Sequence, residues 1–94
     1  MERLVSIQQQ FPLQERSYVD RNGQNQVFAS RGFVMTTGIE TFYAEATGDY
    51  ARSLPQQFDQ NMMHSLQAQL SVCDFRDKDG NTRYQTEVRI IKLV

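Results

Sequence analysis

The chain contains few of the residues on which enzymes and secreted proteins depend. Its one cysteine, Cys73, cannot form an internal disulfide, and its one histidine, His64, cannot supply a Cys/His zinc cluster. Cys73 has no adjacent histidine or basic residue to make it a nucleophile, and no glycine-rich loop is present to hold a phosphate. The sequence therefore predicts a protein that is not an enzyme and has no catalytic residue, metal site or cofactor.

Long apolar runs and an excess of basic residues are also missing. The longest apolar run is far shorter than the roughly 20 residues of a transmembrane helix, and residues 1–4 lead into strand-like sequence rather than a signal peptide. Together with the single cysteine, this predicts a cytoplasmic protein that does not bind membranes. The net charge of −1 counts against tight nucleic-acid binding, because phosphate neutralisation supplies most of that affinity.

The last third of the chain has the pattern of a long β-hairpin. Residues 77–80, Asp-Lys-Asp-Gly, form a tight turn, because aspartate side chains bond nearby N–H groups and Gly80 can adopt a positive φ. On both sides of this turn apolar and polar residues alternate, as in strands with one buried face. The residues expected to face inward are Leu66, Ala68, Leu70, Val72, Tyr84, Thr86, Val88 and Ile90.

Three further strands are predicted before this hairpin, over residues 4–13, 27–37 and 40–47. The polar stretch between the first two carries a second Asx-Gly turn at 20–23. Gly32 interrupts the alternation of the second strand and is interpreted as a β-bulge or as a sharp bend where the barrel curls.

Between residues 48 and 65 the apolar spacing changes to four residues, which favours a helix. The stripe consists of Tyr50, Leu54, Phe58 and Met62. A helical segment of about two turns is expected after Pro55, with Ser53 and Gln56 as its capping box.

Three strands, a helix and two strands follow one another in the element order of an OB-fold. We therefore predict an all-β protein with a single domain over residues 1–94: a five-stranded OB-fold barrel with a short helix between strands three and four. The predicted core consists of Phe33, Met35, Phe42, Leu70, Val72, Val88 and Ile90.

The last hairpin also resembles that of the bacterial single-stranded DNA-binding protein family, including its tailless, primosomal-replication-protein-like relatives. In that family an aromatic residue and an Asx-Gly turn precede Arg-Tyr-x-Thr-Glu-Val, and weaker matches lie at 33–37 and 47–51. The matching residues are Phe75, Asp77, Gly80, Arg83, Tyr84, Thr86, Glu87 and Val88. The resemblance implies an OB-fold that binds single-stranded DNA.

Several positions depart from the pattern of this family. Thr41 and Thr47 occupy positions where the family typically presents a Trp and a Phe for base stacking, and Ser71 and Cys73 occupy positions that are often basic. Glu45 places a carboxylate where an aliphatic residue is usual. An acidic tail like that of the family is not expected, because the last predicted strand reaches Val94.

Single strands are bound by base stacking beside a basic groove. Two residues remain as candidates for stacking: Phe75, which the resemblance retains, and Tyr43, which is expected on the outward face of its strand. Each also has a purely structural alternative, as a packing residue on a neighbouring strand or loop. A basic strip is expected if the two long hairpins lie side by side. Its residues would be Arg21, Arg31, Arg76, Lys78, Arg83 and Arg89. Taken singly, the turn arginines Arg21, Arg76 and Arg83 have the alternative of being solvated hairpin charges.

The predicted function is weak, non-specific binding of single-stranded DNA in replication, recombination or a mobile element. The alternative is an OB-fold interaction or assembly module that has lost DNA binding, which the acidic balance and the glutamine-rich first strand also fit. A homodimer or homotetramer is expected, because the first strand is predicted to end in an exposed edge near Pro12 and family relatives pair through such strands.

Overall fold

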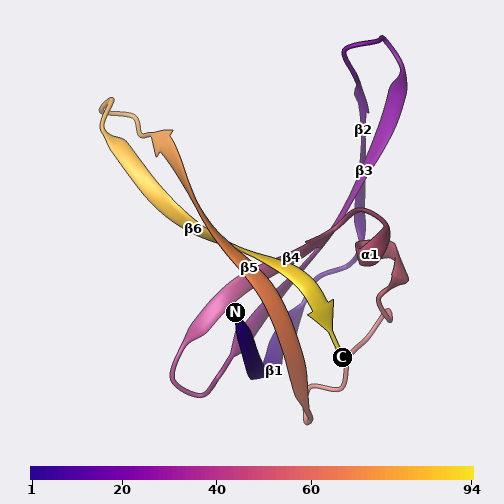
Figure 1. Ribbon diagram of the computed structural model, residues 1–94, viewed down its shortest axis with the longest axis vertical. Coiled ribbons are helices and arrows are strands. Elements are labelled where there is room, and N and C mark those ends of the chain that lie inside the picture. Colours follow the sequence, from indigo (N-terminus) through magenta and orange to yellow (C-terminus); the bar gives the residue numbers. More distant parts are fainter.

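Six strands and one short helix make up the computed structural model, which describes residues 1–94 (Figure 1). In chain order the elements are β1 (Glu2–Gln10), β2 (Gln14–Val19), β3 (Asn25–Thr36), β4 (Thr41–Thr47), α1 (Gly48–Ser53), β5 (Met63–Arg76) and β6 (Thr82–Leu93). The all-β prediction is confirmed.

The strands form one sheet that closes on itself. Its order is β1-β5-β6-β4-β3-β2, and an additional pairing of β1 with β3 closes a ring of five strands. All pairs are antiparallel except β4 and β6, which meet in parallel at Glu45 and Arg89. The sixth strand, β2, extends the ring from β3. The sequence pattern missed β2 because every one of its residues is exposed and no apolar alternation marks it.

The free edge of the sheet includes the expected one and continues beyond it. The first half of β1 pairs with β5 and its second half with β3, so the end of β1 near Pro12 has a strand neighbour on one side only. After Pro12 the chain does not turn back, and β2 continues along the same edge of β3, antiparallel to it as β1 is. The edge expected near Pro12 is therefore present, and β2 lengthens it.

The core lies inside the ring and is small, with 16 of 94 residues buried. Phe33, Met35 and Ile90 are buried as predicted, while Phe42 and Val88 are partly buried at its margin. The remaining apolar core residues are Val5, Ile7, Ala29, Ala44, Ala46, Ala51, Phe58, Leu66, Ala68 and Leu93.

Two predicted core residues, Leu70 and Val72, lie outside the core. They are 51% and 68% exposed, although they have the same parity as the buried Leu66. The prediction is wrong for both because β5 and β6 continue beyond the ring, where no other strand covers their inward face. Alternation predicts which face a residue occupies, but not where along the strand that face is covered.

Two hairpins project from the ring and diverge from each other (Figure 1). One consists of β2 and the start of β3, and the other of the end of β5 and the start of β6. The radius of gyration is 15.3 Å, compared with about 12 Å for a compact chain of this length. Neither β2 nor β3 contacts β5 or β6, so the two hairpins do not lie side by side.

Both hairpins end in the same turn. One oxygen of Asp20 accepts the backbone N–H groups two and four residues ahead, and Asp77 makes the same two bonds, all at 2.9–3.0 Å. The glycine of each turn has a φ of 78° or 79°. The pKa of Asp20 is lowered, chiefly by the N–H of Gln24, and that of Asp77 is lowered, chiefly by the bond from Arg83. The two predicted Asx-Gly turns are confirmed.

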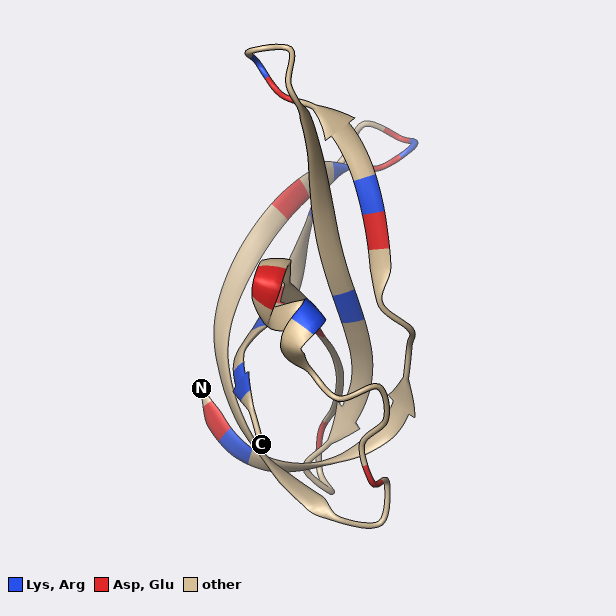
Figure 2. Ribbon diagram, turned by 90° about the vertical axis from the view of Figure 1, so that its right-hand side faces the viewer, with Lys and Arg blue, Asp and Glu red and all other residues tan.

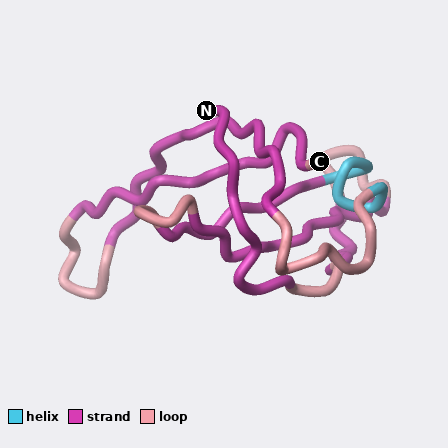
Figure 3. Tube along the Cα trace, turned by 90° about the horizontal axis from the view of Figure 1, so that it is seen from below, coloured by secondary structure: helices cyan, strands magenta, loops and turns pink.

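The helix begins and ends earlier than predicted. It spans only α1 (Gly48–Ser53) and packs against β3 and β4 at one end of the ring (Figure 3). Leu54 has a ψ of 147°, the extended conformation favoured before proline, and this ends the helix at Pro55. Residues 55–62 are irregular, so the helix predicted after Pro55 is wrong. No helix is long and apolar enough to cross a bilayer.

The bulge predicted at Gly32 is also wrong. The pairing of β3 with β4 runs through this residue without a shift in register, and the bulges lie elsewhere, in the β1–β3 and β5–β6 ladders. Gly32 is needed for another reason: a Cβ there would lie 2.0 Å from Oη of Tyr43. The tyrosine ring covers the glycine, and a side chain at this position would displace it.

Candidate nucleic-acid interface

A groove of about 460 Å³ runs between the bases of the two hairpins. Its floor is formed by the outer side of β4 with Tyr43, Glu45 and Thr47, and its sides by Phe28 of β3 and by the β6 segment 85–89. The outward parity predicted for β4 is confirmed, because Ala44 and Ala46 are buried on the opposite face.

Tyr43 is held in place at the groove floor by three neighbours. Its ring lies on Gly32 and is tilted against Phe11, with 6.2 Å between the ring centroids. Its hydroxyl donates to Glu45 at 3.3 Å. Burial, and to a lesser extent the Glu45 charge, raises the pKa of Tyr43, yet 52% of the residue remains exposed. Its ring is therefore both fixed and accessible.

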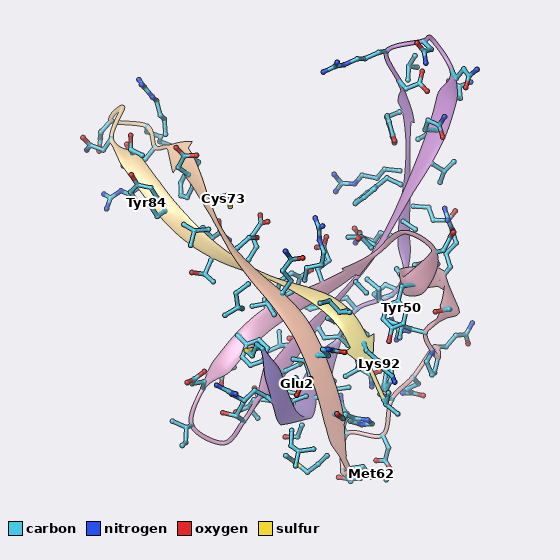
Figure 4. All side chains as sticks on the ribbon, in the orientation of Figure 1. Glu2, Tyr50, Met62, Cys73, Tyr84 and Lys92 are labelled. Atoms are coloured by element: carbon cyan, nitrogen blue, oxygen red, sulfur yellow. The ribbon has the colours of Figure 1, made fainter.

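The β5–β6 hairpin presents one of its two faces toward the other hairpin. Figure 4 shows Cys73 on the side facing that gap and Tyr84 on the opposite side. Phe75 lies two residues from Cys73 and directly opposite Arg83, so both share the Cys73 face. Arg76, the residue after Phe75, shares the Tyr84 face. Phe75 and Arg83 therefore border the groove side, and Arg76 does not.

The β2–β3 hairpin contributes residues that the sequence analysis missed. Phe28 lines the groove, its cross-strand partner is Arg16, and Tyr18 follows two residues later on the same face of β2. All three are exposed. Their common face could have been recognised only by pairing residues 14–19 with 25–30 around the second Asx-Gly turn.

Arg31 does not belong to this surface. It is 4% exposed, and its guanidinium donates to the carbonyls of Phe11 at 3.1 Å, Gln56 at 2.6 Å and Pro55. It also lies over the rings of two core phenylalanines, 5.0 and 5.8 Å from their centroids. Desolvation lowers the pKa of this guanidinium. Its predicted place in an exposed basic strip is therefore wrong.

The remaining basic residues are dispersed. Arg21 and Lys78 lie in the turns at the tips of the two diverging hairpins, and each tip carries acidic residues as well (Figure 2). Arg83 is paired with Asp77 at 2.9 Å. Arg89 lies in the groove, opposite Glu45 in the β4–β6 ladder. The structure therefore does not join these residues into a continuous basic strip.

The groove region carries acidic and small polar residues where the single-stranded DNA-binding pattern would have basic or aromatic ones. The groove lining includes the carboxylates of Glu45 and Glu87 and one guanidinium, that of Arg89. A hydrogen bond with Glu87 raises the pKa of the Cys73 thiol. Ser71 lies opposite Glu87 on the same face, and Thr41 lies at the start of β4. The groove lining is therefore slightly acidic.

No group of three or more histidine, cysteine, aspartate or glutamate side chains is arranged to hold a metal ion. No protein-family model matches the chain, and no curated protein matches it.

Proposed function

We propose that this protein is an OB-fold of the single-stranded DNA-binding type that binds single strands weakly and without sequence preference. The strand order supports the OB-fold part of this proposal. The five ring strands can be renumbered 1 to 5 in chain order, leaving out β2. Their order around the ring is then 1-2-3-5-4, and strand 4 pairs with strand 1 to close it. Strands 3 and 5 are parallel. A helix follows strand 3, as expected for an OB barrel.

The observation that carries the binding proposal is a set of four half-exposed aromatic residues around the groove. Tyr18, Phe28, Tyr43 and Phe75 are 51%, 45%, 52% and 49% exposed. Phe28 and Tyr43 line the groove, and Tyr18 and Phe75 lie further out along the two hairpins, on the faces that continue from it. A single strand lying along the groove could stack successive bases on rings of this kind, each worth roughly 1–3 kcal/mol per base.

The charges of the groove support weak rather than tight binding. Glu45 and Glu87 lie on its lining beside Arg89, and the guanidinium of Arg83 is already paired with Asp77. Few phosphates can therefore be neutralised, and neutralisation supplies most of the affinity of such proteins. We expect micromolar affinity at physiological salt and a shallow salt dependence.

Replacing an aromatic residue should weaken binding equally at every salt concentration. Tyr43→Ala or Phe75→Ala removes a stacking surface but no charge, so each should lower affinity by about five- to 150-fold, the equivalent of roughly 1–3 kcal/mol. Arg89→Ala should instead flatten the log–log salt dependence by about 0.7. The measurement is fluorescence anisotropy of a labelled thirty-base oligo-dT, titrated at several salt concentrations.

Arg76→Ala is the matched control for these variants, because Arg76 follows Phe75 but lies on the opposite face of the hairpin. It should bind like the unmodified protein. Absence of any complex at low salt with about 100 μM protein would contradict the proposed function. An effect of Arg76→Ala as large as that of Arg89→Ala would move the binding surface to the other face.

Removing a groove carboxylate should strengthen binding. Glu45→Gln keeps an oxygen that can accept the Tyr43 hydroxyl but removes a negative charge from the floor. Two unit charges about 4 Å apart in water interact by about 1 kcal/mol, so affinity at low salt should rise about fivefold. The same titration checks this result, with Glu40→Gln as the control, because Glu40 lies in the β3–β4 turn outside the groove. Equal effects of both changes would mean that only net charge matters.

The acidic lining also favours a second candidate, a protein-interaction module. Glu45 and Glu87 beside exposed aromatic rings would suit a basic, partly apolar polypeptide as well as a single strand. This candidate predicts no complex with oligo-dT under the conditions above. The titration therefore distinguishes the two functions.

A further inference from the structure

The end strand β2 has a free edge over its whole length. It pairs only with β3, lies at the end of the sheet order and is exposed at all six residues. Natural sheets commonly protect such edges with proline, lysine, a bulge or a covering loop. β2 contains neither proline nor lysine, and its register with β3 has no bulge.

The hairpin turn determines which backbone groups of β2 are free. The N–H of Asp20 bonds to the carbonyl of Gln24 at 2.9 Å. Because hydrogen-bonded pairs alternate along an antiparallel ladder, the even-numbered residues of β2 bond to β3. The N–H and C=O groups of Glu15, Ser17 and Val19 therefore point away from the sheet, and one further strand could pair with all of them.

The side chains of β2 are complementary to those of a second copy in one antiparallel register. A two-fold axis at Ser17 places Arg16 opposite the partner's Tyr18, and symmetry repeats this pair. A guanidinium against a tyrosine ring is a favourable cation–π arrangement. On the other face, Glu15 lies opposite the partner's Val19, so no like charges meet.

Neighbouring registers that use the same free groups are poorer. An axis at Glu15 would place two carboxylates opposite each other, and an axis at Arg16 would do the same with two guanidinium groups; like charges directly opposite destabilise a strand pair. An axis at Tyr18 or Val19 would bring the two hairpin turns into the ladder and leave at most residues 17–19 of β2 paired, whereas the axis at Ser17 pairs residues 15–19. The side chains therefore favour the register centred on Ser17.

We propose that β2 is a self-association strand, through which two copies of this chain pair edge to edge in an antiparallel dimer centred on Ser17. The six-residue strand is about 20 Å long, so the contact is smaller than a standard interface of about 1,200–2,000 Å². The dimer is accordingly weak and forms at tens to hundreds of micromolar. Arg16 and Tyr18 lie on the groove face of β2, so dimerisation would also bring two grooves together.

Sedimentation of the full chain without DNA tests this proposal independently of the proposed function. As the concentration rises from about 10 μM to 1 mM, the mass should increase from 10.9 kDa toward twice that value. Ser17→Pro removes a free N–H that makes no bond to β3, so it should keep the β circular dichroism spectrum and remain monomeric. Ser17→Ala keeps that N–H and should dimerise like the unmodified chain. A single 10.9 kDa species at 1 mM would overturn the proposal.

A swap of two residues tests the register. Tyr18→Arg places two guanidinium groups opposite each other and should weaken the dimer at least tenfold. The double variant Arg16→Tyr/Tyr18→Arg restores one ring opposite each guanidinium, and its affinity should return to within about threefold of the original. If the single change has no effect, or if the double variant stays as weak as the single one, the Ser17-centred register is wrong. Dimerisation unaffected by Ser17→Pro would show that the copies associate through another surface.

Discussion

Leu66→Ala should lower the free energy of unfolding by about 2–5 kcal/mol, whereas Leu70→Ala should lower it by about 1 kcal/mol or less. The two leucines lie four residues apart in β5 and have the same strand parity. Leu66 is 1% exposed and packs in the core cluster, while Leu70 is 51% exposed on the projecting hairpin. The same substitution therefore leaves a cavity at one position and removes only half-solvated surface at the other.

Urea unfolding followed by circular dichroism gives both values, and the two variants serve as controls for each other. Their m-values should match, since neither changes how much of the chain unfolds. A loss at Leu70 as large as that at Leu66 would mean that the face of the projecting hairpin is covered, contrary to its exposure in this structure.

Arg31→Met should lower the free energy of unfolding by about 3 kcal/mol. Arg31 is a buried guanidinium without a carboxylate partner, and its charge is compensated by three backbone carbonyls and two aromatic rings. Methionine fills a similar volume but donates no hydrogen bond, so the carbonyls of Phe11, Pro55 and Gln56 lose a donor. Arg31→Lys should recover at most half of the loss, because an ammonium cannot reproduce the planar fork.

Arg21→Met is the control, since it removes an equal charge from a hairpin tip and should change stability by less than about 0.5 kcal/mol. Hydrogen exchange adds a local measure. In the Arg31→Met protein the N–H of Phe58 should lose protection, because Arg31 anchors the irregular segment that also bonds Gln10 through Phe58. If Arg31→Met were as stable as the unmodified chain, the buried guanidinium would contribute nothing to holding that segment.

The candidate site was predictable where it depends on strand parity. Tyr43 follows from the alternation of β4, whereas Phe75 came from the resemblance of the last hairpin to the single-stranded DNA-binding proteins. The arginines could not be assigned in this way, because their role depends on neighbours distant in sequence. Arg31 shares its parity with the buried Phe33, but it reaches the carbonyls of Pro55 and Gln56 only because the post-helix segment folds over the end of β3. Arg16, Tyr18 and Phe28 become a common surface only once β2 pairs with β3.

The sequence by itself determined the features that arise from contacts a few residues apart. The Asx-Gly turns at 20–23 and 77–80 are defined by their own side chains, and alternation alone defines the inward face of β4 and the last hairpin. Pro55 likewise ends the helix locally, although the four-residue spacing of Tyr50, Leu54 and Phe58 suggested otherwise.

Only the tertiary structure decided where these local elements are covered. Leu66 and Leu70 obey the same alternation, yet only Leu66 lies within the five-stranded ring, because burial depends on how far neighbouring strands extend. The polar strand β2 exists because β3 provides a pairing edge, which no periodicity in residues 14–19 announces. Backbone hydrogen bonding across a sheet does not depend on side-chain type, so such pairings are determined by the fold and not by the local sequence.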